Sequence, residues 1–396
     1  MKNIIVKLNS SFAFWEAFAK GCNWLLLATL PFYLSEQTYG TIALLSSYLL
    51  LISNVGIIGQ NKVILRFVDQ SNESYIPYNI LISSVTTIVI FIVATQLLEV
   101  KNNFLIQLFI ACILFTNYSL YIAYARKVFD HAGYAKIRVG YALSRLVFGL
   151  SLLWLFGEPV YYLYAEIISI VIGLFIVKQK GIRFFKLQSL SVNDNAFKKS
   201  IRFGSPLIIH SFATFALAYI DRIILGFYLT NDDVGRYVAL YTYAASLSFI
   251  YAILTVSKEP EIYKAESNQQ AETIANDYLK LCLSYGALVA LFVSAFYYVV
   301  FVQLKGVSHD ALIAFGLVIL AHLVTPFYFK MNYLLARMER TSLISLSSIV
   351  AAMVNITLNI LLIPMYGIIG AAMTTVVSYL VLYGLTSYFY YQYGER

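Results

Sequence analysis

Six ionisable side chains stand inside long apolar runs of the sequence, where they could do chemistry. They are Glu16, Lys20, Arg145, Glu166, Asp221 and Arg222. An ionisable group at the centre of a bilayer costs roughly 2.5–3.5 kcal/mol on insertion scales, so it usually faces a cavity or a partner. We therefore treat these six residues as candidates for binding a ligand or a coupling ion.

Glu16 and Lys20 lie four residues apart, so on a helix they share one face, which Asn23 continues. This spacing fits a charge pair that lines a cavity and binds a ligand or a coupling ion. It fits equally a self-neutralising pair near the cytoplasmic end of the helix. The sequence favours neither.

Arg145 lies in YALSRLVFGLSLLW (141–154), far from both ends of its apolar run, and that run holds no acid. Its partner could be Glu166 of the next run, which would make the pair structural, or a phosphate group of a ligand. We slightly favour the phosphate, because a guanidinium matches phosphate oxygens in a bidentate geometry.

A later apolar run carries His210, Thr214 and Asp221 at i, i+4 and i+11, which places them on one helical stripe. Arg222 points about 100° away from Asp221. His210 joins the candidates for ligand binding. The sequence leaves open whether Asp221 and Arg222 pair with a neighbouring helix or act in transport.

Asn355 and Asn359 share a helical face with Ser348 in another apolar run. Asparagine between membrane helices often serves as hydrogen-bonding glue, and we favour that role. Recognition of sugar hydroxyl groups is the alternative, which keeps both asparagines among the binding candidates.

The elements that must position these residues are membrane-spanning helices. Hydrophobic residues make up 60% of the 396 residues and charged residues only 12%, far from the balance of a soluble domain. A spanning helix needs about 20 mostly apolar residues. Twelve such runs lie at about 11–34, 39–60, 78–98, 104–124, 138–156, 159–177, 205–229, 236–256, 279–303, 310–329, 342–363 and 367–391. They do not alternate as barrel strands do, so we expect an all-α integral membrane protein with about 12 transmembrane helices.

The basic residues indicate the topology. With the N-terminus in the cytoplasm, 22 of the 28 Lys and Arg residues fall on cytoplasmic segments and three on the opposite side. This asymmetry obeys the positive-inside rule and predicts an even number of spans with both termini cytoplasmic. Topology explains nearly all of the net charge of +8, so nucleic acid is not an expected partner. The three scattered cysteines predict neither a disulfide framework nor a metal site.

A basic segment at residues 179–203 divides the chain into 1–178 and 204–396, each with six expected helices. We expect this segment to lie on the anionic cytoplasmic leaflet. The halves share a stretch: FYLSEQTYGTIALLSSY (32–48) and FYLTNDDVGRYVALYTY (227–243) align without a gap, with six identities. Both join the first two helices of a half on the outer side. This predicts two six-helix bundles related by a parallel pseudo-repeat, as in several transporter folds.

Glycine and proline are expected to shape the helix ends. Gly40 and Gly235 would permit a tight corner after a helix, and Pro364 would end the eleventh helix. Gly367 and Ala371, four residues apart, would let the twelfth helix approach a neighbour closely.

Catalytic motifs are missing from the sequence. It contains no phosphate-cradling glycine loop, no Gly-x-Ser-x-Gly, no His-Glu-x-x-His and only four histidines. We therefore expect no enzyme activity, no cofactor and no metal. Any transport would draw on a gradient, a membrane potential or the cargo itself.

Three segments carry motifs of a known family. They are LSEQTYGTIALLSSYLLLISNVGIIG (34–59), DRIILGFYLTNDDVGRYVALYTYAASL (221–247) and NITLNILLIPMYGIIGAAMTTVVSYL (355–380). The second holds Asp-Arg, an apolar run and Val-Gly-x-Tyr; the third holds Asn, Ile-Pro and Tyr-Gly-x-x-Gly-Ala-Ala. These patterns resemble those of bacterial polysaccharide flippases, the O-antigen and capsule repeat-unit translocases of the multidrug/oligosaccharidyl-lipid/polysaccharide exporter superfamily. The likeness covers the whole chain in helix number, duplication and length.

This resemblance implies a cargo, an oligosaccharide on undecaprenyl pyrophosphate, moved from the cytoplasmic to the periplasmic leaflet of a bacterial inner membrane by alternating access. The pyrophosphate and acidic sugars would meet Arg145, Lys20 and Arg222, while Glu16 and Asp221 would couple an ion. The implied partners are this lipid-linked cargo and membrane lipids. Action beside a polysaccharide polymerase is left open.

Three other classes of transporter are alternatives. An ion-coupled multidrug or solute exporter of the same superfamily would favour acidic cavity residues, whereas the buried charges here are mixed. A major facilitator carrier would show Gly-x-x-x-Asp-Arg-x-Gly-Arg where this chain has GQNKVILRFVDQ (59–70). A lipid II flippase typically has two further helices. The multidrug exporter remains the main alternative.

Overall fold

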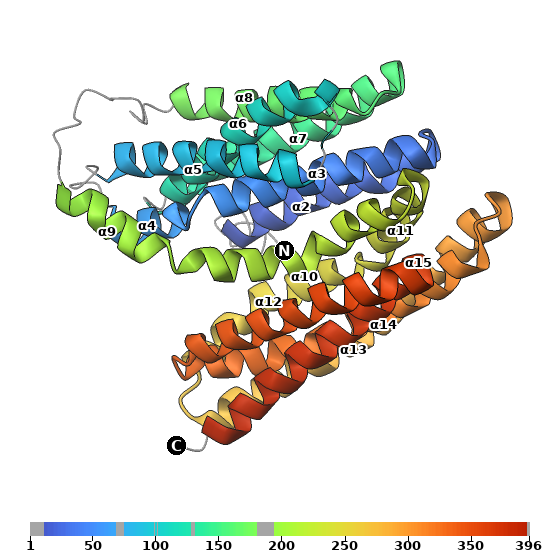
Figure 1. Ribbon diagram of the computed structural model, residues 1–396. Helices are drawn as coiled ribbons and strands as arrows, with labels where there is room; N and C mark the ends of the chain where they lie inside the picture. The colour runs from blue at the N-terminus through green and yellow to red at the C-terminus, as the bar shows by residue number, and fades with distance from the viewer. Residues whose placement is uncertain are drawn as a thin grey trace. The chain divides into compact units, whose positions relative to one another are not determined.

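A computed structural model describes residues 12–68, 75–98, 100, 102–127, 131–179 and 194–393. All regular secondary structure in these residues is helical (Figure 1), as the continuous apolar runs predicted. A helix satisfies its backbone hydrogen bonds within one segment, which a bilayer requires. The chain forms two compact units. The first comprises Met1–Leu34 and Leu45–Phe215, and the second comprises Ser35–Leu44 and Ala216–Arg396.

Two helices contribute residues to both units. They are α3 (Glu36–Gly56) and α10 (Leu207–Tyr228). The first nine residues of α3 belong to the second unit and the rest to the first. The sequence halves 1–178 and 204–396 thus do not coincide with the compact units, and they stay a prediction from the repeat.

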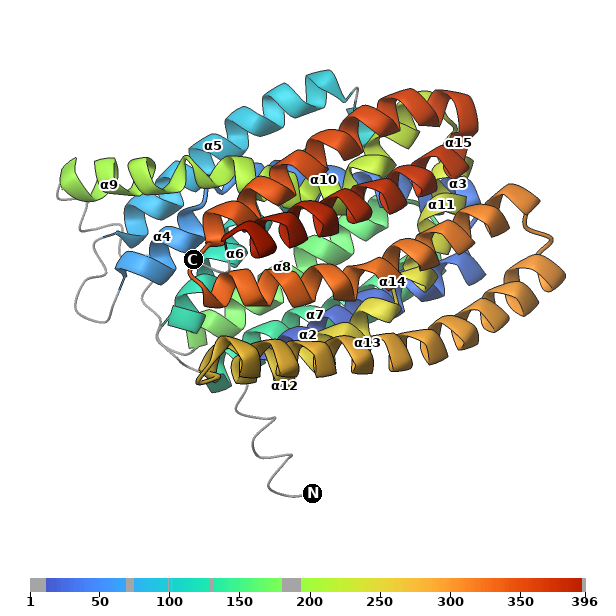
Figure 2. The same ribbon diagram turned by 90° about the horizontal axis from the view of Figure 1, so that it is seen from below.

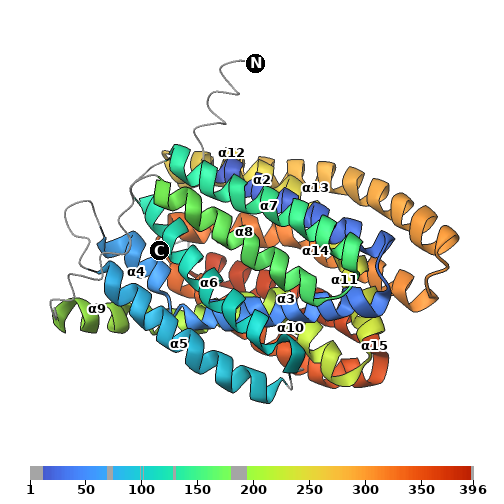
Figure 3. The ribbon, with the colours of Figure 1, turned by 90° about the horizontal axis from the view of Figure 1, so that it is seen from above.

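Among the other described helices of the first unit, three are long and apolar enough to cross a membrane. The whole set is α2 (Phe12–Thr29), η1 (Leu30–Phe32), α4 (Gln60–Phe67), α5 (Ile76–Leu97), α6 (Asn102–Lys127), α7 (His131–Phe156), α8 (Val160–Gln179) and α9 (Asp194–Gly204). Helices α2, α7 and α8 run side by side (Figure 3), with α7 packed against both of the others. A hydrophobic core of this unit is built around tyrosines and aliphatic side chains such as Tyr118 of α6, Tyr141 of α7 and Ile170 of α8.

Short amphipathic helices α4 and α9 pack against each other and against α5. Neither was predicted, because both are shorter than the roughly 20 apolar residues of a membrane span. Helix α9 lies in the predicted basic segment 179–203, of which residues 180–193 are outside the described part of the chain.

The second unit adds six further helical elements. They are α11 (Asn231–Ala244), α12 (Leu247–Lys264), α13 (Asn268–Tyr297), the π-helical η3 (Tyr298–Leu304), α14 (His309–Arg337) and α15 (Thr341–Tyr393). Helices α12, α13 and α14 run side by side (Figure 2), each packed against the other two. The run expected at 236–256 is divided between α11 and α12, which meet at a bend of 41°.

Helix α15 is bent at Gly367, where φ is 56° and ψ is −134°. The break lies three residues after Pro364, which was expected to end the helix. Close approach was predicted at Gly367, but a Cβ there would meet only Leu229 at an ordinary 3.8 Å. Gly370 makes that approach instead, since its Cβ would lie 2.4 Å from the Leu362 carbonyl oxygen. Gly367 supplies the positive φ that the bend requires.

Eight helices among the described residues are long and apolar enough to cross a membrane, or nine if α11 and α12 form one bent span. Helix α15 alone has 53 residues, well over the length of a single crossing. The protein is therefore multi-pass, while the number twelve stays a prediction.

Candidate functional site

A buried charge cluster joins α2, α7 and α8 in the first unit. Arg145 donates hydrogen bonds to Glu166, to the Tyr162 hydroxyl and to the Asn23 side-chain oxygen. Tyr141 also donates to the Glu166 carboxylate. The Arg145 side chain is 12% exposed and that of Glu166 only 2%. The partner seen for Arg145 is thus the structural one, and a ligand phosphate would have to exchange with it.

A second ion pair lies between α2 and α7. Arg138 Nη2 is 2.7 Å from Glu16 Oε1, and Arg138 Nε donates to Glu16 Oε2 at 3.0 Å. The Tyr134 hydroxyl donates to the same carboxylate at 2.7 Å. Among ion pairs of the described residues, Glu16 therefore pairs with Arg138, and Lys20 is exposed. Arg138 was not among the predicted site residues, because its position at the edge of an apolar run predicts a cytoplasmic side chain.

Asp221 and Arg222 are buried in the second unit. Asp221 accepts from the Tyr237 hydroxyl at 2.6 Å and from the Arg222 backbone N–H at 2.8 Å. The Arg222 guanidinium lies 4.9 Å from the Tyr219 ring centroid and 5.4 Å from that of Tyr241. Such cation–π contacts stabilise a cation away from water. Both residues thus have protein partners, and Tyr237 and Tyr241 are members of the cluster that sequence analysis did not select.

His322 of α14 borders this cluster. Its ring meets Tyr241 and Tyr379 edge-on, with centroids 5.6 and 6.1 Å apart. The side chain is buried, and Nε2 has no hydrogen-bond partner among the described residues. A lone histidine in an apolar run was the available signal. The sequence analysis instead chose His210, which lies in the first unit, whereas Asp221 lies in the second.

The two asparagines form a hydrogen-bonded chain across the bend of α15. Asn355 Nδ2 donates to Ser378 Oγ at 3.1 Å, and Asn359 Nδ2 donates to Asn355 Oδ1 at 3.0 Å. Both asparagines are almost completely buried. These are the contacts of the favoured structural role, in which asparagine ties helices together.

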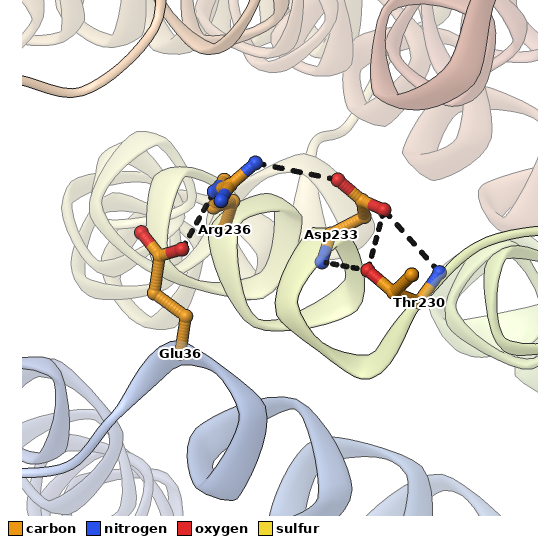
Figure 4. A network of polar contacts seen from close by, with 4 residues as sticks. All are labelled: Glu36, Thr230, Asp233 and Arg236. Carbon is orange, nitrogen blue, oxygen red and sulfur yellow. Dashed lines mark hydrogen bonds and ion pairs between the residues drawn. The ribbon is translucent and has the colours of Figure 1, made fainter.

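A polar network at the start of α11 includes the N-terminal turn of α3 (Figure 4). Thr230 caps α11: its Oγ1 accepts from the Asp233 N–H, and the Asp233 carboxylate accepts from the Thr230 N–H. Arg236 Nε donates to Glu36 at 2.6 Å, and Arg236 Nη1 lies 3.4 Å from Asp233. This capping box fixes where α11 begins. The sequence analysis did not select these residues as a site.

Gly40 and Gly235 lie beside this network, inside helices α3 and α11. The prediction that they form tight corners after a helix is therefore wrong. A Cβ on Gly40 would lie 1.8 Å from the Asn231 carbonyl oxygen, and one on Gly235 would lie 2.1 Å from that of Glu36. The two glycines let the helices touch through their backbones.

The described residues contain no group of three or more His, Cys, Asp or Glu side chains placed to hold a metal ion. Cys22, Cys112 and Cys282 are free and buried. The polar clusters above thus offer ion pairs, hydroxyl groups and aromatic faces.

Comparison with known proteins supplies the family. The profile described as polysaccharide biosynthesis protein matches residues 16–258. The chain belongs to this family. A membrane protein of Methanocaldococcus jannaschii, described as uncharacterized, is 24% identical over 262 residues, or 62% of this chain. The match spans about half of that relative, 51% of its length.

Solved structures with the same fold are transporters and a flippase. An inward-facing multidrug resistance transporter of the MATE family in the MOP superfamily has a TM-score of 0.70 at 11% identity, covering 97% of this chain and 96% of its own. The lipid II flippase MurJ in an inward closed conformation has a TM-score of 0.68 at 14% sequence identity. The match covers 95% of this chain and 86% of the MurJ chain. These likenesses identify the fold of this member of the polysaccharide biosynthesis family.

Proposed function

We propose that this member of the polysaccharide biosynthesis family flips an oligosaccharide on undecaprenyl pyrophosphate from the cytoplasmic to the periplasmic leaflet of a bacterial inner membrane. The observation that carries the proposal is the family match over residues 16–258. The superfamily fold, shared with a lipid flippase, supports it. The cargo would be an O-antigen or capsule repeat unit, and both termini would be cytoplasmic.

The proposed transporter has twelve membrane spans in two six-helix halves, residues 1–178 and 204–396. Movement of the halves would expose the cargo site to each side of the membrane in turn. Duplicated sequence and the helices observed in both halves support this architecture. Membrane lipids surround it, and a polysaccharide polymerase on the outer side would consume its product.

Ligand exchange at Arg145 would couple cargo binding to an ion. A cargo phosphate offers a guanidinium the same bidentate oxygens as a carboxylate, with more negative charge. If phosphate takes the place of Glu166, an ionised carboxylate is left buried without its cation, which is costly. Glu166 would then need another cation, so that cargo binding and uptake of a coupling ion proceed together. The pair Glu16–Arg138, also buried in part, could exchange in the same way.

The decisive experiment is mass spectrometry of lipid-linked intermediates after deletion of the gene in its own host. We expect an undecaprenyl-pyrophosphate oligosaccharide to accumulate and the surface polysaccharide to be lost, both restored by the wild-type gene. An unchanged lipid pool with normal surface polysaccharide would overturn the proposal. Export of drugs or other solutes, the alternative within this superfamily, would then be tested by uptake assays.

A further inference from the structure

The two copies of the duplicated stretch pack against each other within the second unit. An offset of 195 residues makes Glu36 equivalent to Asn231, Gly40 to Gly235, and Thr41 to Arg236. Each of these residues contacts a residue of the opposite copy. The repeat therefore marks a place where the chain meets itself.

The two backbone contacts are equivalent: replacing each residue by its counterpart in the other copy turns one contact into the other. Gly40 faces the carbonyl oxygen of Asn231, and Gly235 faces that of Glu36, the residue equivalent to Asn231. In both copies, therefore, the glycine of the other copy faces the carbonyl group that lies four residues before the copy's own glycine. Hypothetical Cβ distances of 1.8 and 2.1 Å are nearly equal. Glycine Cα–H groups directed at carbonyl oxygens are recurrent contacts between closely packed helices.

The side-chain contacts obey the same exchange. Arg236 donates to Glu36 at 2.6 Å, and Asn231 donates to Thr41 at 2.9 Å. Since Thr41 is equivalent to Arg236 and Glu36 to Asn231, these are two versions of one contact. One version is an ion pair and the other a neutral hydrogen bond. Four contacts in two exchanged pairs identify a local two-fold relation between α3 and α11.

Magnitudes decide which contacts hold the two helices. The Glu36 and Arg236 side chains are 45% and 38% exposed, and an ion pair this exposed contributes about 0–1 kcal/mol. The glycine contacts tolerate no added atom, because the facing group is backbone and cannot rotate away. The backbone approach sets the fit, and the polar pairs fix its register.

We propose that these residues form a self-complementary joint that closes the outer side and must part to release cargo. The expected topology places both copies at outer helix ends. Parting brings the exposed polar groups into contact with water, and the apolar groups exchange protein for lipid tails, which are equally apolar. It also separates the buried hydroxyl oxygens of Tyr39 in α3 and Thr242 in α11, which lie 3.5 Å apart, at a cost of about 1 kcal/mol for one hydrogen bond. This inference rests on the proposed function only where cargo flipping is the quantity measured.

Reversible crosslinking tests the joint. The double variant Glu36→Cys/Arg236→Cys, treated in native membranes with a short bis-methanethiosulfonate, should crosslink within one chain. We expect cargo flipping to be lost while the linker is present and to return after reduction. The two single-cysteine variants are controls, since the native cysteines are buried. Failure to crosslink would refute the joint itself, and full transport in the crosslinked state would refute its opening.

Glycine substitutions provide a second measurement. Gly40→Ala and Gly235→Ala should each abolish crosslinking of the cysteine pair, whereas Gly384→Ala, whose Cβ would meet nothing within 4 Å, should leave it intact. Crosslinking needs no cargo, so its outcome is independent of the proposed function. A gene deletion without a lipid phenotype would overturn the flippase but not the joint. Unchanged crosslinking in both glycine variants would overturn the joint but not the flippase.

The exchange itself can be tested. The double variant Glu36→Asn/Arg236→Thr replaces the ion pair by the residue types of the equivalent neutral contact, Asn231 with Thr41. We expect this variant to retain transport, because asparagine and threonine already form a hydrogen bond at the equivalent contact between Asn231 and Thr41. Loss of transport in this variant at normal protein level would contradict equivalence of the two contacts.

Discussion

At the scale of single residues, three of the candidate charges, Glu16, Arg145 and Glu166, already form ion pairs within the protein. Arg145 contacts Glu166, and Arg138 contacts Glu16. Removing one partner of a buried pair is far more damaging than replacing both, since the remaining charge stays uncompensated. Structural and functional roles can therefore be separated by comparing single with double substitutions.

Glu166→Leu should lower stability by about 3 kcal/mol or more, as expected for an uncompensated buried charge. Arg145→Leu/Glu166→Leu should be more stable than either single variant. The measurement is thermal unfolding in detergent, monitored by the loss of the monodisperse peak in size-exclusion chromatography. If the double variant is stable but does not flip cargo, Arg145 acts in transport; if it flips normally, the exchange proposed at Arg145 is wrong.

Asn355→Ala should destabilise the protein by about 0.6 kcal/mol, typical of a hydrogen bond between membrane helices. It leaves both Ser378 and Asn359 without the contacts described above. Thr357→Ala, at an exposed position of the same helix, is the matched control. Normal stability with lost flipping would instead favour the role of Asn355 in recognising sugar hydroxyl groups.

Sequence could name the charges but not all of their partners. Glu166 was identified as one possible partner of Arg145 because both stand in adjacent apolar runs. Arg138 escaped because position in a run does not tell how far a long side chain reaches. His322 escaped because an isolated histidine in a helix has the same local sequence whether it packs or binds.

At the scale of elements, apolar runs located the long helices well. Each of the twelve expected runs contains helix, but several boundaries and breaks differ. Helices α4 and α9 are too short and polar to register as spans. The eleventh helix was expected to end at Pro364, but the break lies at Gly367, because glycine adopts this non-helical φ without strain.

Gly367→Ala should destabilise α15 by about 1–3 kcal/mol, the cost of forcing a side chain into this backbone region. Gly384→Ala in the straight part of the same helix should be neutral or stabilising by about 0.5–1 kcal/mol, because alanine favours helix. Thermal unfolding of the two variants under identical detergent conditions provides the comparison. Equal effects would contradict a special role for the bend.

At the scale of the whole molecule, the charge asymmetry makes a topological prediction. Reporter fusions after Arg396 should be active only for a cytoplasmic reporter, and fusions after Lys305 only for an extracytoplasmic one. A fusion after Lys180 should behave like the one at Arg396, because the basic segment is expected in the cytoplasm. A reversed pattern at Lys305 would overturn both the orientation and the outer placement of the joint.

Duplication was visible in the sequence, but the meeting of its copies was not. Equivalence of Gly40 and Gly235 follows from alignment, whereas their contact requires the fold. Local reasoning assigned each glycine to its own corner because glycine is common in turns. The conformation of α3 and α11 shows that the same residue type instead serves close helix packing.

The contact between Gly40 and Gly235 has a consequence for ancestry. A surface that complements its own duplicate would also complement an identical neighbouring chain, giving an isologous interface. A six-helix protein with a single such corner would thus assemble as a homodimer. Joining two genes would then turn an interface between subunits into one within a chain. After that fusion each side could diverge separately, leaving Glu36 and Arg236 charged while Asn231 and Thr41 stayed neutral.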